Sequence, residues 1–137
     1  MDAGEADLRK AVRRRARSRC EYCQLPEAYA FIKPFHLEHI VARKHRGPSS
    51  LANTALSCDR CNFRKGSDLT GIDPLTRKLA RLYNPRRMKW SRHFRWQGVL
   101  LVGRTAVGRA TVAVLQMNHE ERLEVREALM EEGIFPP

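Results

Sequence analysis

The chain places its four cysteines in two stretches of equal spacing, Cys20-Glu21-Tyr22-Cys23 and Cys58-Asp59-Arg60-Cys61. Two Cys-x2-Cys pairs are typical of a four-thiolate zinc site, because each tight turn presents two sulfur atoms to one tetrahedral ion. Disulfides are the alternative. They are typical of secreted chains, whereas this N-terminus is acidic where a signal peptide would be basic and then apolar. We therefore expect Cys20, Cys23, Cys58 and Cys61 to bind a structural Zn²⁺.

The interval between the two pairs is longer than a zinc ribbon needs, and it carries polar residues suited to phosphodiester hydrolysis. That reaction needs a base that activates water and a hard cation that stabilises charge on the phosphate. His39 can be the base, and Glu38 offers the kind of oxygen ligand that Mg²⁺ or Mn²⁺ prefers. After the second pair, Asn62 can supply a second oxygen, and Lys65, one helical turn further, can face the same phosphate.

Together, these residues make the segment from about Arg19 to Gly66 resemble the HNH endonuclease family, whose core is a ββα-metal fold. The resemblance implies that Glu38 is the acidic metal ligand and His39 the general base. It also implies that Asn53 braces the loop that holds the base, and that Asn62 is the metal ligand on the helix. The implied activity is metal-dependent hydrolysis of DNA, with Mg²⁺ or Mn²⁺ as the catalytic ion.

The sequence departs from the family pattern at two positions. Glu38 stands where Asp is commoner, and Asn62 stands where His is commoner. His36 lies two residues before Glu38 and therefore on the same side of a strand, so that its imidazole can approach the metal. Other interpretations stay open: Glu38 as a surface partner of Arg43 or Lys44, Asn53 as a turn residue, and Asn62 as a residue at the start of a helix.

The balance of charge points to a polyanionic partner. The chain has 137 residues, with 26 Lys and Arg against 15 Asp and Glu, and a formal net charge of +11. The candidate DNA-binding residues are Arg13, Arg14, Arg17, Arg64, Lys65, Arg86 and Arg87. We expect a cytoplasmic protein that binds double-stranded DNA and no membrane, since no apolar run approaches the roughly 20 residues that span a bilayer. One site cuts one strand, so cleavage of both strands would need a homodimer or successive nicks.

Two other functions fit the same charge pattern. One is a zinc-knuckle module that binds DNA or RNA without catalysis, and the other is a nuclease of the same type that acts on RNA.

Periodicity and turn residues predict an α+β fold. We expect a single domain over 1–137, with a basic helix in 1–19, a zinc-braced core in 20–70, and a basic and aromatic extension with C-terminal helices in 71–137. The expected elements are helices over 5–19, 59–67, 73–82 and 118–131, a helix capped by Thr105, strands over 35–39 and 54–57, and an aromatic hairpin over 90–102.

Overall fold

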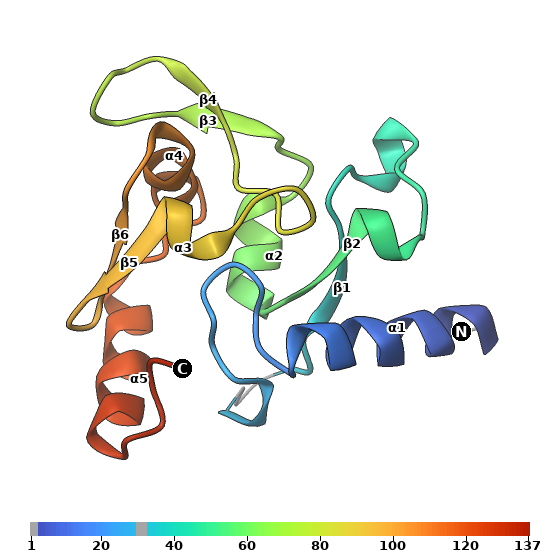
Figure 1. Ribbon diagram of the computed structural model, residues 1–137, viewed down its shortest axis with the longest axis horizontal. Helices are drawn as coiled ribbons and strands as arrows, with labels where there is room; N and C mark the ends of the chain where they lie inside the picture. The colour runs from blue at the N-terminus through green and yellow to red at the C-terminus, as the bar shows by residue number, and fades with distance from the viewer. Residues whose placement is uncertain (1–2, 30–32) are drawn as a thin grey trace. The chain divides into compact units, whose positions relative to one another are not determined.

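The computed structural model describes residues 3–29 and 33–137, and the chain divides into two compact units. The first unit comprises residues 1–67 and 84–86, and the second comprises 68–83 and 87–137. Helices and small antiparallel sheets occur in both, which confirms the predicted α+β class (Figure 1). In the described part of the chain, no helix has the length and apolar character needed to cross a bilayer.

The first unit is built on a two-stranded antiparallel sheet. Strand β1 (His36–His39) pairs with β2 (Thr54–Ser57), and His39 lies opposite Thr54. Both strands were predicted, and β2 is buried along its whole length. Single 3-10 turns occupy Glu27–Tyr29, Arg43–His45 and Leu51–Asn53.

Helix α1 (Ala3–Ala16) packs against β2 through its apolar stripe, and Val12 on that stripe is fully buried. The prediction that this helix continues to Arg19 is wrong. Arg17 and Ser18 both adopt left-handed backbone conformations, with φ values of 56° and 55°, which end the helix and turn the chain into the first cysteine pair.

Helix α2 (Asp59–Lys65) follows β2 directly. Its N-cap is Cys58 rather than Asp59, because the Cys58 sulfur accepts a hydrogen bond from the Cys61 N–H at 3.4 Å. Gly66, with φ of 52°, ends the helix, so that it stops short of the predicted boundary at Ser67. The second cysteine pair is thereby fixed to the first turn of α2.

The second unit contains two hairpins and three helices. The hairpins are β3 (Thr70–Ile72) with β4 (Leu79–Arg81), and β5 (Phe94–Gln97) with β6 (Leu100–Gly103). The helices are α3 (Trp90–His93), α4 (Ala106–Val114) and α5 (Glu120–Glu131). Thr105 caps α4 as predicted, since its hydroxyl accepts from the Gly108 N–H. The aromatic hairpin is confirmed for 94–103, while Trp90–His93 forms one helical turn instead of strand.

The predicted helix over 73–82 is wrong. Residues 70–81 form the β3–β4 hairpin instead, with Ile72 opposite Leu79. Asp73 begins the turn: its N–H bonds to the Lys78 carbonyl, and its carboxylate accepts from the Leu75 N–H at 3.0 Å. A pair of bonds from Arg109, both 2.9 Å long, holds the same carboxylate. This distant arginine favours a turn over the helix cap that Asp-Pro suggests locally.

Candidate functional site

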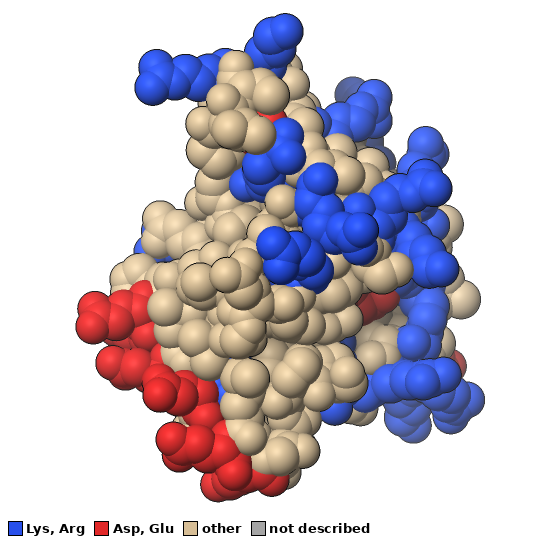
Figure 2. Space-filling view, turned by 60° about the vertical axis from the view of Figure 1, so that its left-hand side comes forward, with Lys and Arg blue, Asp and Glu red and all other residues tan. Residues whose placement is uncertain are grey.

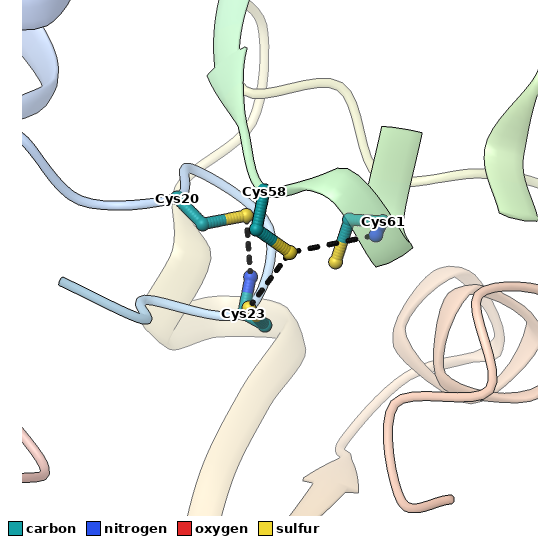
Figure 3. Close-up of side chains that lie close together, drawn as sticks. All are labelled: Cys20, Cys23, Cys58 and Cys61. Atoms are coloured by element: carbon teal, nitrogen blue, oxygen red, sulfur yellow. Dashed lines mark hydrogen bonds between the residues drawn. The ribbon is translucent and has the colours of Figure 1, made fainter. Parts of the chain in front are cut away.

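The four cysteines meet in one buried cluster, as predicted. Cys20 and Cys23 come from the turn that follows α1, and Cys58 and Cys61 come from the start of α2 (Figure 3). Their sulfur atoms all lie within 4.8 Å of one another, and the Cys23 and Cys58 sulfurs are 3.7 Å apart. A tetrahedral zinc ion with Zn–S bonds of about 2.3 Å places its sulfurs about 3.8 Å apart. All four cysteines are free thiols, so the cluster fits zinc rather than disulfides.

Burial, hydrogen bonding and the charge of neighbouring cysteines all change the pKa of the Cys20 thiol. Burial is the main cause that raises the pKa of the Cys20 thiol well above its ordinary value. The backbone N–H of Cys23 points at the Cys20 sulfur at 3.5 Å, as the Cys61 N–H does at the Cys58 sulfur. A cation bound among four such sulfurs favours their thiolate forms.

Glu38 lies inside the first unit, held by residues from both cysteine-bearing segments. The Tyr22 hydroxyl donates to its Oε2 at 2.6 Å, and the Lys65 ammonium lies 2.7 Å from its Oε1. Lys65 also donates to the Ile40 carbonyl at 2.9 Å. Burial, followed by the charge of Glu38, raises the pKa of Tyr22 well above its ordinary value, which keeps the phenol in its donating form.

This arrangement corrects the predicted role of Lys65. Its side chain is 2% exposed, and its ammonium is occupied by Glu38 and Ile40, so it does not face a phosphate at the surface. Glu38 is 4% exposed, which also excludes the alternative that it is a surface partner of Arg43 or Lys44. The sequence contained one sign of this burial. Lys65 follows the fully buried Cys61 by four residues and therefore shares its helix face.

His39 ends β1 next to Glu38 and has partners of its own in the loop that follows the strand. Its imidazole is half-buried, and its Nε2 lies 2.8 Å from the Ser49 hydroxyl. Arg43 donates to the same Nε2 at 3.4 Å. Burial first and the positive charge of Arg43 second lower the pKa of His39, against a smaller opposing effect of Glu38. The neutral imidazole, which can accept a proton, is therefore the favoured form.

Asn53 ties together the loop that follows His39. Its side-chain amide donates to the carbonyls of Val41 and Pro48 at 3.0 and 2.9 Å, and its Oδ1 accepts from the Val41 N–H at 3.0 Å. Gly47 permits this closure, because a Cβ there would lie 1.7 Å from the Val41 carbonyl oxygen. The loop that carries Ser49 is thus held from the end of β1 to the start of β2.

His36 and Glu38 lie on the same side of β1, as their spacing predicted, and both contact side chains of α2. The His36 Nε2 lies 2.8 Å from the Asp59 carboxylate at the start of the helix, and Glu38 pairs with Lys65 at its end. Asn62 lies on α2 three residues from each of Asp59 and Lys65, and hence near the same helix face. Asp59 was not predicted as a site residue, although its Asp-x2-Asn spacing to Asn62 was visible in the sequence.

The candidate DNA-binding arginines divide into two groups. Arg13 and Arg86 form ion pairs within the first unit, with Glu27 at 3.0 Å and with Glu21, so their positive charge is partly balanced by these acids. Among the predicted DNA-binding residues, the arginines with exposed side chains are Arg14, Arg17, Arg64 and Arg87. Figure 2 shows Lys and Arg side chains over much of the face drawn, whereas most of the visible acidic side chains form one band. The exposed acids of α5 and the residue after it are Glu120, Glu121, Glu124, Glu127, Glu131 and Glu132.

Comparison with known families identifies the site-bearing segment. Residues 20–68 match the model of the family described as HNH endonuclease. The matched segment contains all four cysteines together with Glu38, His39, Asn53 and Asn62, which confirms the resemblance seen in the sequence. The match covers residues 20–68 of the 137 and supports a nuclease-family function for this segment. No curated protein and no solved structure matches the chain.

Proposed function

We propose that this chain, through its HNH segment, is a divalent-metal-dependent endonuclease that hydrolyses phosphodiester bonds of DNA. The observation that carries the proposal is the position of His39 within that segment. Its half-buried imidazole has a lowered pKa and presents Nε2 beside Ser49, in a loop that Asn53 holds in place. A general base needs these properties: access, a neutral resting form and a fixed orientation.

The residues between β1 and α2 suit a hard cation. Glu38 and Asn62 would hold the ion, with His36 and Asp59 beside them. Carboxylate, amide and imidazole groups are ligands that Mg²⁺ or Mn²⁺ accepts. When bound, such an ion would neutralise charge on the phosphate and on the departing 3′ oxygen. Glu38 can contribute an oxygen only by sharing it with Lys65 or Tyr22, since both already bind the carboxylate.

In the proposed reaction, water replaces the Ser49 and Arg43 contacts of His39 Nε2, and this nitrogen takes a proton from the water as the water oxygen attacks phosphorus. The bond from phosphorus to the 3′ oxygen then breaks, and the 3′ oxygen acquires a proton from solvent. Asn53 acts as a positioning residue, because its hydrogen bonds hold the loop next to the base rather than any reacting atom. The exposed arginines Arg14, Arg17 and Arg64 would contact the backbone through charge alone, so binding would weaken steeply with salt.

A second function, nucleic-acid binding without cleavage, has one observation in its favour. The carboxylate of Glu38 is buried and already paired with Lys65, so a metal there must compete with an internal cation. The cysteine cluster and the basic surface would serve a binding module equally well.

Relaxation of supercoiled plasmid distinguishes the two functions. Wild-type protein is compared with His39→Ala in Mg²⁺, in Mn²⁺ and in EDTA, at low salt. His45→Ala is the matched control, since His45 is an exposed histidine in the same loop. We expect metal-dependent nicking that falls about 10²–10⁴-fold in His39→Ala and is unchanged in His45→Ala. Binding to a labelled duplex in EDTA should be the same for all three proteins.

Two results would contradict the nuclease. Wild-type protein that binds the plasmid yet leaves it supercoiled with every metal supports the binding module instead. Equal nicking by wild type and His39→Ala removes His39 as the base. Competition between unlabelled duplex DNA and duplex RNA decides which nucleic acid is the substrate.

A further inference from the structure

The β3–β4 hairpin of the second unit exposes an apolar face. Ile72 and Leu79 lie directly opposite each other across the two strands, and they are 54% and 68% exposed. Leu75, in the turn between the strands, is 71% exposed. Large aliphatic side chains that gather on one exposed face of a small unit mark a contact surface for another molecule.

The hairpin cannot turn this face inward, because its other face already packs on α4 (Figure 1). Gly71 and Ala80, which alternate with Ile72 and Leu79 along the strands, belong to that inner face. The strand lies so close to α4 that a Cβ on Gly71 would come within 2.5 Å of the Val114 Cγ2. Since the inner face packs on α4, the outer face with Ile72 and Leu79 is exposed to solvent.

The turn is held rigid by Asp73, which is fully buried. Its carboxylate accepts hydrogen bonds from the Leu75 N–H, from the Thr76 hydroxyl and from Nε and Nη2 of Arg109. These bonds fix Leu75 in place and pair the negative charge of Asp73 with Arg109. A rigid apolar surface binds with less loss of conformational entropy than a mobile one.

Within the hairpin itself, residues 70–81, the exposed charged side chains are all positive, and the exposed Asp68 lies just before it. Arg77, Lys78 and Arg81 are exposed on the same hairpin, and Arg81 shares the outer face with Leu79. Residues 74–119 contain no Asp or Glu. A hairpin that combines a basic rim with aliphatic groups matches a duplex, whose phosphates are anionic and whose grooves accept apolar side chains.

We propose that the outer face of the β3–β4 hairpin is a duplex-DNA contact, in which Arg77, Lys78 and Arg81 bind phosphates and Ile72, Leu75 and Leu79 pack against a groove and loosen a base step. This inference rests on the proposed function for the choice of DNA. It assigns to the second unit a binding surface that lies outside the segment of residues 20–68.

The test measures binding to a fluorescein-labelled duplex in EDTA, so that it does not depend on cleavage. The double variant Ile72→Thr/Leu79→Thr removes the apolar groups and keeps residues that favour strands. Leu100→Thr is the matched control, since Leu100 is an exposed leucine on β6 in the same unit. We expect the double variant to bind roughly tenfold more weakly, because each lost apolar group costs part of its burial. Its salt dependence should be unchanged, and Leu100→Thr should bind as wild type does.

Two further measurements separate the roles of charge and apolar contact. The triple variant Arg77→Gln/Lys78→Gln/Arg81→Gln should lower the slope of log K against log salt by about 2–3, one phosphate contact per lost cation. A duplex that carries 2-aminopurine should brighten on binding wild-type protein, because unstacking relieves quenching, and should brighten less with the double threonine variant. Circular dichroism of each variant establishes that it is folded.

Specific results would overturn the proposal. A folded double variant that binds with unchanged affinity excludes the apolar contact. A double variant that binds normally but no longer forms a dimer in sedimentation shows that the face binds a second copy of this chain. If wild type nicks plasmid but the hairpin variants bind normally, the hairpin proposal fails while the nuclease stands. If wild type binds through the hairpin but never nicks, the nuclease proposal alone fails.

Discussion

Replacing Lys65 with methionine should destabilise the first unit by about 3–5 kcal/mol, because it removes the cation from a buried ion pair and leaves its partner charged. Lys65 is 2% exposed and lies 2.7 Å from Glu38, whose remaining polar partner in the described residues is the Tyr22 hydroxyl. One hydrogen bond from a phenol does not compensate a buried carboxylate. Methionine keeps an unbranched apolar stem of similar length, so that little of the loss comes from packing.

A double-mutant cycle measures how much of the lost stability comes from the ion pair between Lys65 and Glu38. Glu38→Gln/Lys65→Met removes both charges, and the introduced amide would still accept from Tyr22 through its side-chain oxygen. We expect the double variant to lie within about 1–2 kcal/mol of wild type, since replacing a whole buried ion pair by neutral groups is often close to neutral. Arg64→Met is the matched control, because Arg64 is an exposed cation on the same helix and should change stability by less than about 0.5 kcal/mol.

The assay is urea unfolding of the zinc-loaded protein, followed separately in the two units. Amide hydrogen exchange of peptides from β1 and α2 reports the first unit. Tryptophan fluorescence reports the second, because both tryptophans, Trp90 and Trp96, lie there. Only the first-unit signal should move. A Lys65→Met variant that is as stable as wild type but loses affinity for DNA would refute the buried ion pair, since Lys65 would then be the phosphate contact that the sequence predicted.

Two more predictions concern metal removal and acid. Stripping zinc with a strong chelator should remove exchange protection from β1 and β2, because a structural zinc contributes on the order of 10–16 kcal/mol in small fingers. Metal analysis should find one zinc per chain in protein purified without chelator, and an absence of zinc would contradict the site. Hydrogen bonds from Arg109 are the main cause that holds the pKa of Asp73 below its ordinary value. The stability that this carboxylate provides is therefore complete above the unfolded pKa of about 3.9, and it is lost as the pH falls through the lower pKa of the folded state. Asp73→Asn should therefore flatten the fall in melting temperature below about pH 4, and an equally steep fall would refute the role of Asp73.

The sequence predicted those elements whose determinants are close together in the chain. The Cys-x2-Cys spacing places two sulfurs in each turn whatever the rest of the fold does, and the cluster formed as expected. Strand β1 and the capped helix α4 likewise follow from local patterns. The 73–82 helix failed because Asp73 binds Arg109, 36 residues away, and no local signal carries that pairing.

The site residues also divide into those with partners close in the sequence, which could be predicted, and those with distant partners, which could not. Asn53 and the loop after His39 involve neighbours within about a dozen positions, and the structure joins them through direct hydrogen bonds. Lys65 and Glu38 are far apart in the sequence. Because Lys65 follows Arg60, Asn62 and Arg64 in α2, the sequence predicted that it is an exposed cation. Its burial depends on the packing of α2 against β1, and the one local sign of that packing was the four-residue spacing from Cys61 to Lys65.

The contacts of Glu38 join the cysteine cluster to the candidate catalytic site. Tyr22 stands next to Cys23, and Lys65 stands four residues after Cys61, so each cysteine pair carries one of the two groups that hold the carboxylate. Loss of zinc would free both segments at once, so that β1 and α2 would no longer hold Glu38 and Asn62 beside each other. Zinc removal should therefore weaken binding of the catalytic ion as well as unfold the knuckles, and this effect should already appear at chelator concentrations that unfold only part of the protein. Calorimetric Mn²⁺ binding at graded zinc content measures it, and an unchanged Mn²⁺ affinity per folded molecule would show that the two sites act independently.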